Sequence, residues 1–250
     1  MKRLLIILVW LTVISSPGAA QFFGFQLGAG ACSFRAPLAE TDPPLDIISD
    51  YSSLWSSSVS AGFMVVHPIN NAFSVESGVN FLQKGGRENW IIHDEGASAT
   101  DTTFIQDVFD EYRLSSIEVP LIINHDKSGL FGGFLVNKVV HFSFQRLADF
   151  KYIHQNQEVL LRNDIDGYDG NTTELNFINP YEISWVFGYR YHVKNYMHLG
   201  LGLSSGMTQV FETGAAPWLN YKTVEFRFSI RYFLNLPAED KGEFRAMEST

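Results

Sequence analysis

The sequence predicts an all-β protein, an eight-stranded antiparallel up-and-down transmembrane β-barrel, from three observations. Three consecutive segments between Tyr181 and Leu234 alternate apolar and polar residues at period two, as strands with two unlike faces do. These segments are about twice the usual strand length of soluble proteins and long enough to cross a bilayer when tilted. Short and long connections alternate along the chain, as in small transmembrane barrels. Tyrosines typical of an aromatic girdle lie near the ends of the apolar faces: Tyr181, Tyr191, Tyr196, Tyr221 and Tyr232.

The first twenty residues have the pattern of a cleaved signal peptide. Lys2 and Arg3 precede an apolar run, Leu4 to Ile14, and small residues follow up to Ala20. The apolar run is too short for a spanning helix, and no later stretch reaches the roughly twenty apolar residues that such a helix needs. We therefore expect a signal peptide at 1–20, an outer-membrane barrel at 21–234 and a polar periplasmic tail at 235–250.

Composition restricts the possible partners. The formal net charge is −9, and it becomes −11 once Lys2 and Arg3 leave with the signal peptide, which argues against nucleic acid as a partner. Cys32 is the single cysteine, so the chain has no internal disulfide, and we interpret it as an ordinary strand residue.

Five further strands complete the predicted barrel. The alternation places them at 23–32, 55–66, 73–81, 112–123 and 130–144. The facing of the last one stays open, because Gly132-Gly133 and Asn137-Lys138 interrupt its pattern. Short turns are expected at 67–71, 125–129 and 193–196, and long loops at 36–54, 87–111, 146–176 and 211–220. Short turns in such barrels face the periplasm, so we expect extracellular long loops and periplasmic mature termini.

The polar face of the strands predicts a charge network inside the barrel. An eight-stranded barrel has an interior just wide enough for side chains to fill. A buried charge without a partner costs several kcal/mol, so the inward charges should pair and plug the lumen. A gated ion or proton path is the alternative. The charged residues on the predicted inner face are Glu76, Glu118, Glu182, Arg190, Glu225, Arg227 and Arg231.

Catalytic and metal-binding patterns have little support in the sequence. The seven histidines are scattered without a paired-ligand spacing, and no nucleophile-elbow or phosphate-loop motif occurs. We therefore expect no enzyme activity, no cofactor and no metal. The alternative is a lipid-modifying enzyme with a Ser/His/acid set at the barrel rim, for which Ser204, Ser205 or the loop histidines are the candidates. The Asp-rich run from Asp164 to Asn171 lacks the bidentate glutamate of a calcium loop, because Leu175 stands at the twelfth position, and a surface turn is the better interpretation.

Three short features occur together in the mature chain. They are a glycine-rich first strand after the Ala20-Gln21 junction, the segment 81–86 (Phe-Leu-Gln-Lys-Gly-Gly), and the segment 117–121 (Ile-Glu-Val-Pro-Leu). Together they resemble the PorT-like outer-membrane β-barrel family common in Bacteroidetes, over nearly the whole mature chain. Some members of that family serve the type IX protein secretion system, and many have no assigned role. The chain departs from the family in the polar tail after Phe233, where such barrels usually end on an aromatic residue.

Two classes of function, with a third in reserve, are compatible with these features. The first is a non-enzymatic barrel that contacts outer-membrane lipids and acts as a component or partner of a larger outer-membrane assembly; the resemblance implies type IX protein secretion. A narrow transport or ligand-binding barrel is the second, and the rim enzyme is the third. A soluble lipocalin-like barrel is the competing fold. Long loops on a rigid scaffold often carry recognition, so we expect the working surface there, with the tail as the rival.

Overall fold

The computed structural model describes residues 22–35, 48–94, 102–154, 157–171, 178–194, 196–210 and 222–234. The predicted signal peptide at 1–20 and the predicted tail at 235–250 lie outside the described residues. Within these ranges no helix is long and apolar enough to cross a membrane. The strands are β1 (Phe22–Arg35), β2 (Ile48–Pro68), β3 (Phe73–Asp94), β4 (Thr102–His125), β5 (Leu130–His154), β6 (Gln157–Asn171), β7 (Tyr181–Lys194), β8 (Met197–Gly206) and β9 (Lys222–Phe233).

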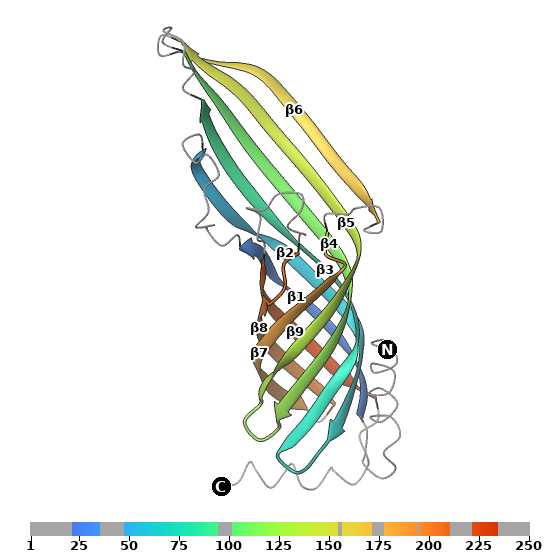
Figure 1. Ribbon diagram of the computed structural model, residues 1–250. Coiled ribbons are helices and arrows are strands. Elements are labelled where there is room, and N and C mark those ends of the chain that lie inside the picture. Colours follow the sequence, from blue (N-terminus) through green and yellow to red (C-terminus); the bar gives the residue numbers. More distant parts are fainter. Residues whose placement is uncertain are drawn as a thin grey trace.

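Eight of these strands close into a barrel. β1 to β5 pair in chain order, β7 pairs with β5, β8 and β9 follow, and β9 returns to pair with β1. Every pairing is antiparallel. β6 pairs with the far part of β5 and lies outside the ring (Figure 1). The predicted fold class, an eight-stranded up-and-down barrel, is confirmed.

Short turns join the strands at one end of the barrel, and local hydrogen bonds explain them. In the β2–β3 turn, the side-chain oxygen of Asn70 accepts from the backbone N–H groups of Ala72 and Phe73, at 2.8 and 2.9 Å. In the β4–β5 turn, Gly129 has a φ of +73°, a conformation that favours glycine. The start of β1 and the end of β9 lie at this same end, where the Leu234 N–H donates to the Phe23 carbonyl at 2.8 Å.

At the opposite end, β3, β4 and β5 continue past the ring and form a sheet extension with β6 (Figure 1). The sheet extension comprises residues 84–94, 102–116, 139–154 and 157–171, paired antiparallel with register shifts at Ser115/Ser116 and at Phe150/Lys151. The expected loops at 87–111 and 146–176 are therefore wrong over most of their length, and β2 starts within the expected loop at 36–54. The strands could continue there because a sheet outside the membrane can carry charged residues on either face. The apolar alternation used to define strand ends does not apply to it.

The outer surface of the ring is an apolar belt. Large apolar side chains on alternating positions of each strand are exposed, and their chain neighbours point inward. On β5 the outward positions include Leu130 and Phe134 and the inward positions include Phe131, Leu135 and Val139, which settles the facing that the sequence left open. An exposed apolar surface that surrounds the whole ring is suited to lipid rather than water. The belt includes Phe25, Leu27, Phe63, Phe81, Ile117, Phe187, Leu201, Phe228 and Ile230.

Aromatic side chains border the belt. Tyr191, Tyr196 and Tyr232 are exposed near the short-turn end, where the rings of Tyr196 and Tyr232 are 5.4 Å apart. Tyr181 is exposed near the other border. Tyr221 lies outside the described residues. The predicted girdle positions that the structure describes are thus on the outer surface at the two edges of the belt.

Candidate functional site

Strand alternation places all seven predicted charged residues inside the barrel. Each occupies an inward position between outward neighbours, as Glu118 does between Ile117 and Val119. Six of the seven are buried, and the Arg227 side chain is 12% exposed. The ion pairs of these residues form three layers along the barrel axis, the first of which is nearest the short-turn end.

The layer nearest the short turns contains two arginines and one glutamate. Oε2 of Glu76 accepts from Arg190 at 2.8 Å and from Arg231 at 2.6 Å. The Phe131 ring lies next to both guanidinium groups, with centroid distances of 5.2 and 5.8 Å. A cation near an aromatic face is stabilised by the ring quadrupole. The layer therefore holds two buried guanidinium groups with one carboxylate and one aromatic ring.

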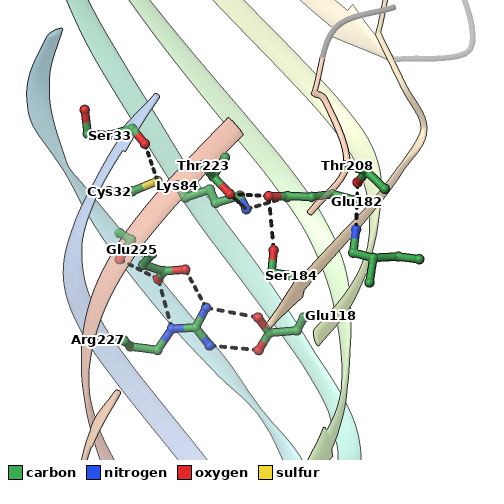
Figure 2. A network of polar contacts seen from close by, with 12 residues as sticks. Cys32, Ser33, Lys84, Glu118, Glu182, Ser184, Thr208, Thr223, Glu225 and Arg227 are labelled. Carbon is green, nitrogen blue, oxygen red and sulfur yellow. Dashed lines mark hydrogen bonds and ion pairs between the residues drawn. The ribbon is translucent and has the colours of Figure 1, made fainter. Parts of the chain in front are cut away.

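The middle layer is centred on Arg227. Its guanidinium group donates to both oxygens of Glu118, at 2.8 and 3.0 Å, and to both oxygens of Glu225, at 2.9 and 2.8 Å (Figure 2). Asn80 donates to Glu118 at 3.0 Å, and Ser58 donates to Glu225 at 2.9 Å. Bidentate arginine–carboxylate pairs are among the stronger hydrogen-bonded contacts in proteins. Arg227 thus ties β4 to β9 across the lumen.

The layer nearest the sheet extension contains a lysine that sequence reasoning missed. Nζ of Lys84 lies 2.5 Å from Oε2 of Glu182, with both side chains about 2% exposed (Figure 2). Thr223 and Ser184 also donate to Glu182. Glu182 therefore pairs with a lysine that is absent from the seven predicted residues. Lys84 has the same inward phase as Glu76 and Asn80, so continuing the β3 alternation past Phe81 would have identified it.

Apolar side chains close the lumen above and below these layers. At the sheet-extension end, Phe34, Tyr112, Leu114, Val139 and Phe142 pack with Ile178 and Val210, which come from the segments before β7 and after β8. Backbone hydrogen bonds from Val139 to Pro180 and from Asn179 to Val210, at 2.9 and 2.8 Å, fasten these segments over the mouth. At the short-turn end, Met64, Val66 and Phe233 form a second cluster with Phe22 against it.

A small cavity remains between the first and middle layers. Its volume is about 40 Å³, and its lining includes Glu76 and Arg231 on one side and Glu118 and Arg227 on the other. Apolar residues of a third cluster, among them Phe131 and Leu135, complete the wall. A polar cavity of this size can hold a few water molecules. It is far smaller than the pockets of several hundred Å³ that bind organic ligands.

Tyr112 and Asp126 are ionisable groups outside the belt with shifted pKa values. Burial raises the pKa of the Tyr112 hydroxyl well above its usual range, and the carboxylates of Glu88 and Asp110 raise it further. The hydroxyl therefore stays neutral and donates to Asp110 at 3.3 Å. In the β4–β5 turn, burial raises the pKa of Asp126, and the hydrogen bond from Ser74 opposes that rise.

The described part of the chain does not assemble the catalytic and metal candidates into one site. No group of three or more His, Cys, Asp or Glu side chains there could hold a metal ion. Ser204 lines the small cavity, and His198 of the same strand is roughly 20 Å away along β8. Ser205 is half-buried. The backbone of Asp164 to Asn171 belongs to β6 rather than to a turn, and the side chains of that run lie outside the described residues.

Comparisons with known proteins return structural neighbours at low similarity. No protein-family model and no curated protein matches the chain. Neisserial surface protein A matches 87% of this chain and 99% of its own, with 12% identity and a TM-score of 0.32. The attachment invasion locus protein Ail of Yersinia pestis matches 85% and 98%, with 8% identity and a TM-score of 0.34. OprG of Pseudomonas aeruginosa matches 85% and 96%, with 7% identity and a TM-score of 0.27. At these TM-scores the likeness carries no conclusion about this chain.

Proposed function

We propose that the protein is a non-enzymatic outer-membrane barrel that acts as a component or partner of a larger outer-membrane assembly. The single observation that supports this proposal is the contrast between the lumen of the barrel and the sheet extension. The lumen is filled by buried ion pairs between apolar clusters, whereas the sheet extension carries a large paired surface beyond the belt. Residues 102–116 of β4 alone span roughly 45 Å when extended. A closed lumen favours a role for the outer surfaces over transport.

The predicted signal peptide and the short turns between strands support the membrane location and the orientation of the barrel that we propose. A signal peptide and a belt of tilted strands favour the outer membrane. Short turns at the end that holds Phe23 and Leu234 favour a periplasmic location for that end, which directs the sheet extension to the cell exterior. The resemblance of the 81–86 and 117–121 segments to PorT-like barrels supports protein secretion, through the type IX system, as the process that the assembly serves.

Co-purification tests the proposed assembly. A tagged chain extracted from outer membranes with mild detergent should retain a partner in stoichiometric amount. Replacing residues 150–162 with a two-residue turn shortens the β5–β6 hairpin at a paired position, because Asp149 faces Asn163. This variant should lose the partner, whereas a chain without residues 236–250 should keep it. The reverse result would move the working surface to the periplasmic tail.

Planar bilayers test the transport alternative on the same preparations. We expect no regular conductance steps from the purified chain, because charged layers and apolar clusters fill the described lumen. Reproducible steps in an otherwise partner-free preparation would favour the narrow transport barrel over the assembly role.

A further inference from the structure

Three cations lie together on the outer surface where the apolar belt meets the sheet extension. They are Arg87 on β3, Arg113 on β4 and Lys138 on β5, three adjacent strands of the ring. We call these three residues the basic row. The net charge of the whole chain is −9, so a group of exposed cations at one border is a local feature that composition does not predict.

The chain neighbours of each cation show that the basic row faces outward. Lys138 is exposed between Asn137 and Val139, which are 1% and 2% exposed. The Arg113 side chain is 59% exposed, and it follows Tyr112 and precedes Leu114 in the apolar cluster of the lumen mouth. The Arg87 side chain is 42% exposed. None of the three belongs to the network inside the barrel.

The strand register places the basic row at the edge of the belt. Lys138 is paired with Ile117 on β4 and with the girdle residue Tyr181 on β7, so it lies beside a tyrosine at the edge of the belt. Arg113 is four residues further along β4, and Arg87 is opposite Glu111 beyond it. Measured along the strands, Arg113 lies roughly 13 Å from Ile117 and Arg87 roughly 20 Å from Phe81, and the strand tilt makes their heights above the belt smaller than these lengths. The basic row therefore begins at the belt edge and continues on the side of the sheet extension.

Glu111 forms ion pairs with Arg87 and Arg113, but its single negative charge does not neutralise the basic row. It accepts from Nε and Nη2 of Arg113 at 3.1 and 3.0 Å and from Arg87 at 3.5 Å. One carboxylate between two guanidinium groups leaves a net charge of +1, and Lys138 adds a second positive charge. Gly85, which is paired with Arg113, presents no side chain beside it on the outer face. The two arginine side chains remain 42% and 59% exposed beside this shared carboxylate.

We propose that the basic row binds the phosphate groups of anionic lipids in the leaflet next to the sheet extension. Arginine presents a planar fork of donors that matches a phosphate, and lysine supplies a point charge. Continuity with the lipid-facing belt selects a lipid phosphate as the occupant, because Lys138 is paired with the belt residue Ile117 and with the girdle residue Tyr181. The proposal depends on the bilayer position of the belt and is independent of any protein partner.

Native mass spectrometry of the chain released from nanodiscs tests this binding. The nanodiscs contain phosphatidylcholine with a minor fraction of diphosphorylated lipid A, and the readout is the fraction of barrels that retain lipid A. The test variant is R87Q/R113Q/K138Q. The matched control, K127Q/K194Q/K222Q, removes the same charge from exposed lysines outside the basic row. A shift in gel mobility of the unheated protein verifies that each variant is folded.

The test variant should lose apparent lipid A affinity by about five-fold for each charge removed, and the control should stay within two-fold of the parent. R87K/R113K/K138R should restore most of the binding, and excess inorganic phosphate should not displace the lipid. Equal losses in test variant and control would overturn the proposal, since binding would then follow net charge alone. Unchanged retention in the test variant would overturn it as well, even if a protein partner were lost. Displacement by inorganic phosphate would replace it with a free-phosphate site.

Discussion

Loss of Arg227 should destabilise the barrel more than loss of either of its carboxylate partners. The guanidinium group donates to both oxygens of Glu118 and of Glu225, and these two glutamates are buried at 1% and 2% exposure. Arg227→Met would leave both carboxylates facing each other without a cation between them. Removing one member of a buried ion pair commonly costs about 3 to 5 kcal/mol.

Glu118→Gln should be milder, because Arg227 keeps Glu225 as a charged partner. A charged hydrogen bond contributes about 1.5 to 3 kcal/mol, so a cost in that range is expected. The double variant, Arg227→Met with Glu118→Gln, lacks the repulsion between the two glutamates. Only Glu225 is then left as a buried carboxylate without a cation. The cost of the double variant should therefore fall below the sum of the single costs by at least about 1 kcal/mol.

The free energies of unfolding come from urea titrations of the barrel in lipid vesicles, followed by tryptophan fluorescence. Glu225→Gln provides the matched second cycle, and its coupling to Arg227 should be similar in sign. Additivity within about 0.5 kcal/mol in both cycles would refute the network argument. A larger cost for Glu118→Gln than for Arg227→Met would refute the assignment of Arg227 as the shared centre.

Three further predictions use the same unfolding assay. Leu201→Arg in the belt should cost about 2 to 4 kcal/mol, whereas Leu234→Arg at the belt edge should cost about 1 kcal/mol or less. Gly86→Val should cost about 1 to 3 kcal/mol, because a Cβ at position 86 would lie 2.1 Å from the Phe34 ring. Gly132→Ala should be nearly neutral, because a Cβ at position 132 would have its nearest neighbouring atom at 3.7 Å. The pKa of Asp126 is raised in the folded state, so the protonated carboxyl group favours the folded state at pH values below the unfolded-state pKa near 3.8. This contribution to stability is lost as the pH rises through the folded-state pKa. Asp126→Asn should flatten that part of the pH profile by a small amount, since the carboxyl group is half-exposed; an unchanged profile would contradict the assignment.

The ring and its facing could be predicted because the bilayer imposes a strict pattern. Each membrane strand must place apolar residues outward at every second position, so β7 and β9 could be assigned directly from Tyr181 to Val193 and from Val224 to Leu234. β5 resisted assignment because both of its faces carry apolar residues. Phe131 and Leu135 fill the lumen, while Leu130 and Phe134 face lipid.

The sheet extension could not be predicted from the same pattern. Outside the membrane the backbone ladder from β3 to β6 supplies the pairing, and charged residues can occupy either face. The acidic segment from Arg87 to Glu111 therefore gave no apolar alternation, although most of it is strand. The same boundary error hid Lys84 and, with it, the partner of Glu182.

Charge acts differently in the three zones of this molecule. Inside the ring, Glu76, Glu118 and Glu182 are each held by a cation from another strand, so these charges fix the strands against one another. At the edge of the belt, Arg87 and Arg113 share one carboxylate, and their side chains remain 42% and 59% exposed. An acidic chain can therefore repel anions through its overall field and still bind them at one border, because salt screens that field within about 10 Å whereas direct contacts act at hydrogen-bond distance. The position of each charge along the strands, rather than the total of −9, determines what the surface can bind.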